Sequence, residues 1–154
     1  MKQDELVSYI IDYINSNLNR FVSIDELADC FGYEKSYIMK TFKKKIGITI
    51  KSYSNNRRIL NSLKDLQGDQ SLLKIALNNG FNSLEYYSEM FSKEVGVSPS
   101  TYRKYLHRKA TVESVRKIKL FLDRLKELNI KLLGYRAFKA RTLRLVIPKE
   151  KKYF

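Results

Sequence analysis

The sequence contains only one cysteine and one histidine. Because Cys30 stands alone, a disulfide within the chain is excluded, and Cys30 with His107 supplies too few soft ligands for a typical zinc site. No run of 18 apolar residues occurs, and the start of the chain lacks a charged lead followed by an apolar signal core. We therefore expect a cytoplasmic protein with no metal, no other cofactor and no membrane partner.

Catalytic constellations are also lacking. No grouping of histidine, cysteine and carboxylate and no glycine-rich phosphate loop is visible in the sequence. Cys30 follows Leu27 and Ala28 on a predicted helix, so we expect a buried filler rather than a nucleophile. His107 is expected to be a surface side chain. The sequence therefore predicts that the protein is not an enzyme.

Positive charge is abundant and unevenly placed. The formal net charge of the chain is +14. Residues 1–107 hold 15 Lys and Arg against 12 Asp and Glu, a net of +3, whereas residues 108–154 hold 15 against 4, a net of +11. Such an excess favours a polyanionic partner, and most of it lies in the last third of the chain.

The chain contains an internal repeat. "GYEKSYIMKTFKKKIG" spans residues 32–47 and "GFNSLEYYSEMFSKEVG" spans residues 80–96. When Phe42 is aligned with Phe91, the two copies match downstream without gaps. Each copy predicts a short helix, a turn marked by glycine, and a second helix with an apolar stripe, which together form a helix-turn-helix unit.

Three further helices are predicted around the two units. They cover residues 4 to about 18, residues about 50 to 66, and a short stretch with Pro99 in its first turn. Residues 1–107 are therefore expected to be all-α, with two helix-turn-helix units joined by one long helix. The residues expected to cap helices are Ser23, Ser71 and Ser98.

The second helix of the first unit has a strongly basic outward face. Paired helices with a tight turn also occur in bundles that bind no nucleic acid, so the charge is what favours DNA. A helix with such a face suits insertion into a major groove flanked by phosphates. The outward residues are Lys35, Ser36, Met39, Lys40, Lys43 and Lys44.

Residues 4–106 resemble the DNA-binding domain of the AraC/XylS family of bacterial transcription regulators. The resemblance rests on "LADCFGYEKSYIMKTFKKKIGI", on Tyr53 and Arg58 after it, and on "IALNNGFNSLEYYSEMFSKEVGVSPSTYRK". It implies a seven-helix domain whose two recognition helices enter successive major-groove segments, held apart by a linker helix. It also implies promoter binding, often with contact to RNA polymerase.

Carried onto this chain, the family's base-reading positions in the first unit fall on Ser36, Met39 and Lys40. Lys40 could donate hydrogen bonds to guanine, and Ser36 could act as either a hydrogen-bond donor or an acceptor. Met39 could pack against a thymine methyl group. Other basic residues are expected to contact phosphates, which set the register on DNA without reading sequence. These residues are Lys35, Lys43, Lys44, Arg103 and Lys104.

The second unit departs from this pattern. Residues 83–95 carry one lysine against three glutamates, a net of −2, whereas residues 33–46 carry five lysines against one glutamate, a net of +4. We therefore expect the second unit to bind DNA weakly or to read it narrowly. Glu85 has a structural explanation as the acid after an Asn82 N-cap, while Glu89 represents either a cytosine contact or a lost contact. The family positions here are Leu84, Glu85, Ser88 and Glu89.

The basic tail, residues 108–154, lies beyond the domain at 4–107. An amphipathic helix is predicted at 112–128, followed by strand-like runs at 131–135 and 143–147, a possible hairpin. Three interpretations stay open. The helix packs on or pairs with another chain through its apolar face, the tail adds phosphate contacts, or the tail opens a further domain.

The sequence thus predicts a sequence-specific transcription regulator that reads double-stranded DNA mainly with the first recognition helix. The alternative is a protein-interaction module with the same fold, which binds a regulator or RNA polymerase through the tail and the acidic second unit. The basic face at 35–44 favours DNA binding. The glutamates Glu85 and Glu89 and the tail helix favour the alternative.

Overall fold

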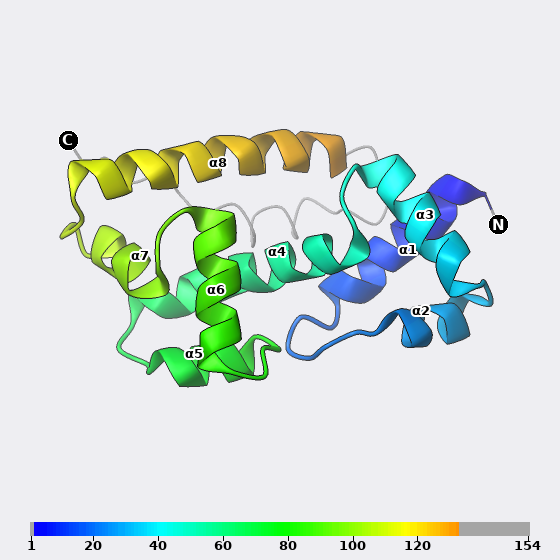
Figure 1. Cartoon of the computed structure of the whole chain (residues 1–154), viewed down its shortest axis with the longest axis horizontal. Helices are drawn as coiled ribbons and strands as arrows, with labels where there is room; N and C mark the ends of the chain where they lie inside the picture. The colour runs from blue at the N-terminus through cyan, green and yellow to red at the C-terminus, as the bar shows by residue number, and fades with distance from the viewer. Residues whose placement is uncertain (1, 133–154) are drawn as a thin grey trace.

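The computed structural model describes residues 2–132, and within them every regular element is a helix (Figure 1). The all-α class expected from the sequence is confirmed, as are both helix-turn-helix units and the linker helix between them. In chain order the elements are α1 (Gln3–Asn15), α2 (Ile24–Phe31), α3 (Lys35–Ile46), α4 (Ile50–Ser62), the 3-10 helix η1 (Leu63–Gln67), α5 (Leu72–Asn78), α6 (Leu84–Val95), α7 (Pro99–Leu106) and α8 (Val112–Leu132).

Most helices begin with a hydroxyl that accepts a hydrogen bond from the amide three residues later. This confirms the caps expected at Ser23, Ser71 and Ser98. The predicted cap of α6 was wrong by one residue, because Ser83 rather than Asn82 accepts from the Tyr86 amide, at 3.1 Å. Glu85 still lies in the first turn of α6, where the helix dipole favours an acidic side chain.

The two units have equivalent cores. The stripe of α3 is buried beneath α1 and α2, and the stripe of α6 is buried against α4 and α5, as the spacing predicted. Helix α4 runs between the units (Figure 1). Since each recognition helix is held by its own apolar stripe, its opposite face is left to solvent. The buried residues of the stripes are Ile38, Phe42 and Ile46 in α3 and Tyr87, Phe91 and Val95 in α6.

The turn of the second unit touches the loop that starts the first. Gly80 adopts a φ of +83°, in the left-handed region, and a Cβ at this position would meet Leu18 O and Arg20 N at 3.0 Å. Only glycine combines this backbone conformation with so close an approach. The contact brings the α5–α6 turn against the α1–α2 loop, so the two units are joined by more than α4.

Helix α8 lies along the domain with its apolar face buried against α6 and α7 (Figure 1). It runs four residues beyond the predicted end. Lys131 and Leu132, expected to open a strand-like run, instead end this helix, because the apolar spacing continues to Leu132. The rest of that run and the run at 143–147 lie outside the described residues.

His107 and Cys30 differ in how well their exposure could be predicted from the sequence. His107 is exposed, as expected, and its Nε2 lies 2.9 Å from the Gln67 carbonyl. Cys30, expected to be a buried filler, is exposed. Leu27 is the only fully buried residue of the short helix α2, and Cys30 does not belong to the core cluster.

Candidate nucleic-acid interface

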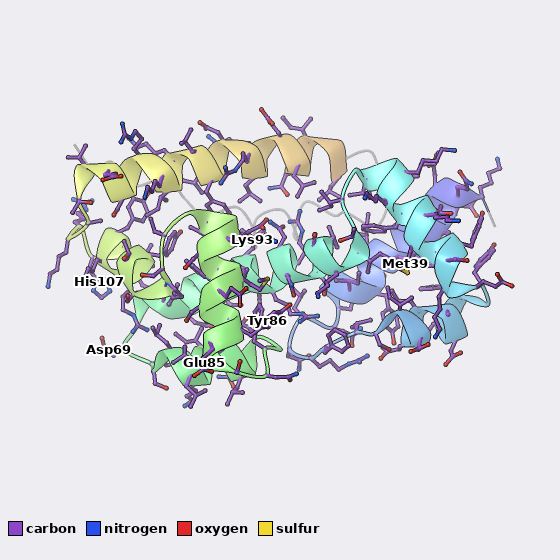
Figure 2. The ribbon with its side chains drawn as sticks, viewed as in Figure 1. Met39, Asp69, Glu85, Tyr86, Lys93 and His107 are labelled. Carbon is purple, nitrogen blue, oxygen red and sulfur yellow. The ribbon has the colours of Figure 1, made fainter. Side chains whose placement is uncertain are left out.

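The first recognition helix, α3, presents a continuous polar and basic face. Ser36, Met39, Lys40, Lys43 and Lys44 are all exposed, and Met39 is 50% accessible although it is apolar. Figure 2 shows Met39 on α3, far along the molecule from the acidic start of α6. The lysines of the last turn lie where the helix dipole favours positive charge, so they stabilise α3 while remaining accessible to an anion.

Lys35 differs from the other lysines of this helix. It forms an ion pair with Asp25 of α2, and both side chains are largely exposed. The hydrogen bond to Asp25 raises the pKa of Lys35 above its usual value. Lys35 thus stabilises the pairing of α2 with α3, and a phosphate would have to compete with Asp25 for it.

Tyr37 is a further exposed residue of the α3 face, not predicted as a site residue from the sequence. Its ring stacks on Tyr33 with centroids 5.1 Å apart and an interplanar angle of 23°. The pair lies at the turn that leads into α3, where it adds a hydroxyl and aromatic surface. The spacing of the two tyrosines, four residues apart across a helix start, was the available signal.

The second recognition helix, α6, is acidic at its accessible face. Glu85 and Glu89 are exposed and Ser88 is half-buried. Glu94, which contributed to the negative count of this segment, points into the domain and accepts a hydrogen bond from Asn56 Nδ2 at 2.5 Å. Figure 2 shows Glu85 and Lys93 at opposite ends of α6. The negative charge offered to a ligand therefore comes from two glutamates in the first half of the helix.

The predicted phosphate contacts on α7 are not equivalent. Arg103 donates from Nε to Leu66 O at 3.1 Å and from Nη2 to Gln70 O at 2.7 Å. These bonds hold α7 against the end of η1 and the loop that follows. Lys104 is exposed. Arg103 therefore stabilises the fold, and only its remaining N–H groups could bind a phosphate.

A buried polar group joins the linker helix α4 to α8. Arg57 of α4 has no accessible surface, and both of its terminal nitrogens donate to Asn129 Oδ1 at 3.2 Å. Its guanidinium lies 5.1 Å from the centre of the Tyr53 ring, and burial lowers the pKa of Arg57. Helix α8 thus supplies one acceptor for a buried charge of the linker helix.

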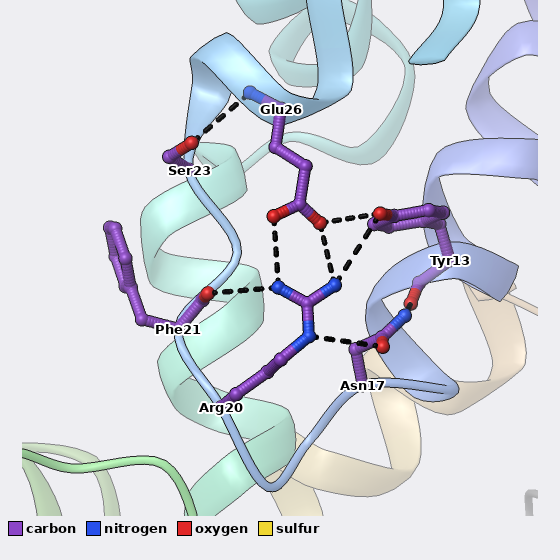
Figure 3. A network of polar contacts seen from close by, with 6 residues as sticks. All are labelled: Tyr13, Asn17, Arg20, Phe21, Ser23 and Glu26. Atoms are coloured by element: carbon purple, nitrogen blue, oxygen red, sulfur yellow. Dashed lines mark hydrogen bonds and ion pairs between the residues drawn. The ribbon is translucent and has the colours of Figure 1, made fainter. Parts of the chain in front are cut away.

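A second polar network sets the start of α2 (Figure 3). Arg20 binds the Glu26 carboxylate with two parallel bonds, Nη1 to Oε1 at 2.8 Å and Nη2 to Oε2 at 2.7 Å, while the Tyr13 hydroxyl donates to the same carboxylate. The hydrogen bond from Arg20 is the main cause that lowers the pKa of Glu26 to about 2. The carboxylate in turn raises the pKa of Tyr13 to about 12. The network joins α1 to the unit that carries α3.

Two negative findings concern residues 2–132. No group of three histidine, cysteine or carboxylate side chains in this range is arranged to hold a metal ion. Within the same range, no helix is both long and apolar enough to cross a membrane.

The architecture, two helix-turn-helix units on one linker helix with an exposed basic recognition face, is that of an AraC-type DNA-binding domain. A family described as a helix-turn-helix domain matches residues 27–105, and the chain belongs to this AraC-type family. The resemblance stated from the sequence is confirmed.

Named relatives share the same region. The HTH-type transcriptional activator AarP of Providencia stuartii is 33% identical over 102 residues, which cover 66% of this chain and 76% of AarP. The transcriptional regulatory protein HptR of Staphylococcus aureus is 37% identical over 101 residues, but this chain spans only 40% of its length.

Solved structures show the same fold. The C-terminal domain of AraT, a response regulator from Geobacillus stearothermophilus, has a TM-score of 0.62 at 22% identity, covering 65% of this chain and 84% of that domain. The DNA-binding domain of the transcriptional factor AdpA, solved with a target DNA, has a TM-score of 0.61 at 20% identity, covering 66% of this chain and 92% of the AdpA domain.

Proposed function

We propose that this protein binds specific sequences in double-stranded DNA and regulates transcription there, reading the major groove mainly with α3. The observation that carries the proposal is the exposed basic face of α3 on a helix-turn-helix scaffold whose second recognition helix is acidic. Basic side chains on an exposed recognition helix neutralise DNA phosphates and donate hydrogen bonds to guanine. Glutamates are instead repelled by the phosphates of the DNA backbone. The names of AarP and HptR, an activator and a regulator of transcription, support the same class.

Within α3, we assign base reading to Ser36, Met39 and Lys40, which lie on its exposed face. Lys43 and Lys44 follow one turn later and suit phosphates. Tyr37 is added as a hydroxyl donor to a phosphate at the helix start. On other elements, Lys104 suits a phosphate, while Lys35 and Arg103 are minor contributors because Asp25 and two carbonyl groups already bind them.

For the second unit, we propose a minor reading role. Ser88 is half-buried and Glu85 stabilises the helix start through the dipole. Glu89 has no such structural partner among the described residues and faces solvent. We therefore assign it to a lost base contact rather than to cytosine reading.

Two further partners were expected from the sequence. Self-association through the apolar face of α8 is not proposed, because that face is buried against α6 and α7 of the same chain. A contact with RNA polymerase is proposed as well, and family membership is the only support for it.

The test is selection from a randomised duplex pool, followed by fluorescence anisotropy on the enriched sequence at two salt concentrations. We expect one enriched motif and a steep fall in affinity with salt. Lys40→Ala should cost about 1–3 kcal/mol of binding free energy on that motif. Lys64→Ala, which removes an exposed lysine on η1, is the matched control and should change little. Weak binding without a motif, indifferent to Lys40, would favour the protein-interaction module instead.

A further inference from the structure

A pocket of about 350 Å³ lies between the two helix-turn-helix units. Its walls come from the loop before α2, from α4, and from the turn between α5 and α6. The volume falls within the range of small-molecule sites, which combine apolar walls with a few convergent polar groups. The residues that matter for its chemistry are Phe21, Lys51, Ser54, Asn55, Arg58 and Phe81.

Arg58 is a buried cation in the wall of this pocket, only 3% exposed. Its Nη2 donates to Ser54 Oγ at 2.8 Å and its Nη1 to Gly80 O at 3.5 Å, so both acceptors are neutral. No carboxylate between residues 2 and 132 pairs with it, and burial lowers the pKa of Arg58. A buried charge is normally paired, and a guanidinium has five N–H groups, of which these bonds use two.

One face of α4 gathers the polar groups of the pocket. Lys51, Ser54, Asn55 and Arg58 follow the spacing i, i+3, i+4 and i+7, which places them on a single stripe. Aromatic groups stand beside this stripe, with the rings of Phe21 and Phe81 centred 5.5 Å and 5.8 Å from the Arg58 guanidinium carbon. The pocket thus offers two cations on one wall and apolar surface next to them.

We propose that this pocket binds a small amphipathic carboxylate, whose carboxyl group pairs with Arg58 and Lys51 and whose apolar body lies against Phe21 and Phe81. A phosphate of duplex DNA suits the pocket less well, because it would reach Lys51 at the rim and leave the apolar walls uncovered. Since the walls come from both units, the ligand stabilises their present relative placement. This proposal can be tested separately from the proposed DNA reading, because ligand binding is measured without DNA.

The experiment is isothermal titration of the full chain with three probes: 3-phenylpropionate, its uncharged counterpart 3-phenylpropanol, and inorganic phosphate. We expect the acid to bind with a Kd on the order of 1 mM, since it has about eleven non-hydrogen atoms. The alcohol and the phosphate should each bind at least about tenfold more weakly, since each lacks half of the recognised chemistry. Equal binding of acid and alcohol, phosphate binding as tight as the acid, or no binding of the acid would each overturn the proposal.

Variants locate the binding. Lys51→Gln should weaken 3-phenylpropionate binding at least about threefold, because it removes one of two charges near the carboxylate. Lys64→Gln removes the same charge outside the pocket and should leave the affinity unchanged. Phe21→Ala should weaken acid and alcohol alike. Arg58→Lys also disturbs bonds to Ser54 and Gly80, so the decision rests on Lys51: acid binding that survives Lys51→Gln undiminished would contradict the proposal.

Discussion

At the scale of single residues, Glu89 distinguishes the two recognition helices most sharply. It is exposed on α6, where a negative charge faces the phosphates of any DNA bound to the second unit. We predict that Glu89→Arg raises affinity for unrelated duplexes about three- to tenfold and steepens the salt dependence by roughly one to two phosphate equivalents. Anisotropy at several salt concentrations measures both quantities.

The matched control is Glu127→Arg, which makes the same charge change at an exposed position of α8. Its effect on general affinity should be smaller, because α8 lies outside the two recognition helices. If Glu89→Arg instead lowered affinity only for the enriched motif, Glu89 would be a cytosine contact and the idea of a lost contact would be abandoned.

The Glu26 carboxylate gives a pH-dependent prediction. Its folded pKa of about 2 lies below the ordinary value of 4.5, so its pairing stabilises the fold fully above that ordinary value and is lost as pH falls toward 2. Glu26→Gln should lower Tm by about 2–4 °C at pH 7, a modest change because the pair is partly exposed. The difference between wild type and variant should shrink steadily below pH 4.5. A difference independent of pH between 7 and 3 would refute the assignment.

At the scale of secondary-structure elements, α8 packs against α6 and α7. Asn129 provides the Oδ1 that accepts both terminal nitrogens of buried Arg57, which joins α8 to the linker helix. We predict that Asn129→Ala lowers the free energy of unfolding by about 1.5–3 kcal/mol, because a buried charged donor loses an acceptor. Urea unfolding measures the change.

Ile130→Ala is the matched control, one residue away and 69% exposed on the same helix. It should cost less than about 0.5 kcal/mol, as surface substitutions usually do. If both variants lost the same stability, general weakening of α8 rather than the bond to Arg57 would be responsible.

At the scale of the whole molecule, the sequence predicted the repeated units because their apolar spacing and glycine turns are local signals. It predicted the exposed face of α3 for the same reason, since a helix buries one stripe and exposes the opposite one. The features that could not be predicted from the sequence depend on contacts between segments that are distant along the chain. Asn129 meets Arg57 across 72 positions, and Arg58 meets the Phe81 turn only after folding. The exposure of the Cys30 and Tyr37 side chains likewise depends on which neighbouring elements cover each helix.

The central claim is that the two recognition helices are unequal, with α3 reading most of the sequence. The most direct measurement repeats the selection from a randomised duplex pool with wild type, Lys40→Ala and Ser88→Ala in parallel. Our account predicts that Lys40→Ala abolishes or rewrites the enriched motif, whereas Ser88→Ala leaves most of its positions intact. A motif that survives Lys40→Ala but is lost with Ser88→Ala would place the reading on α6 and contradict the account.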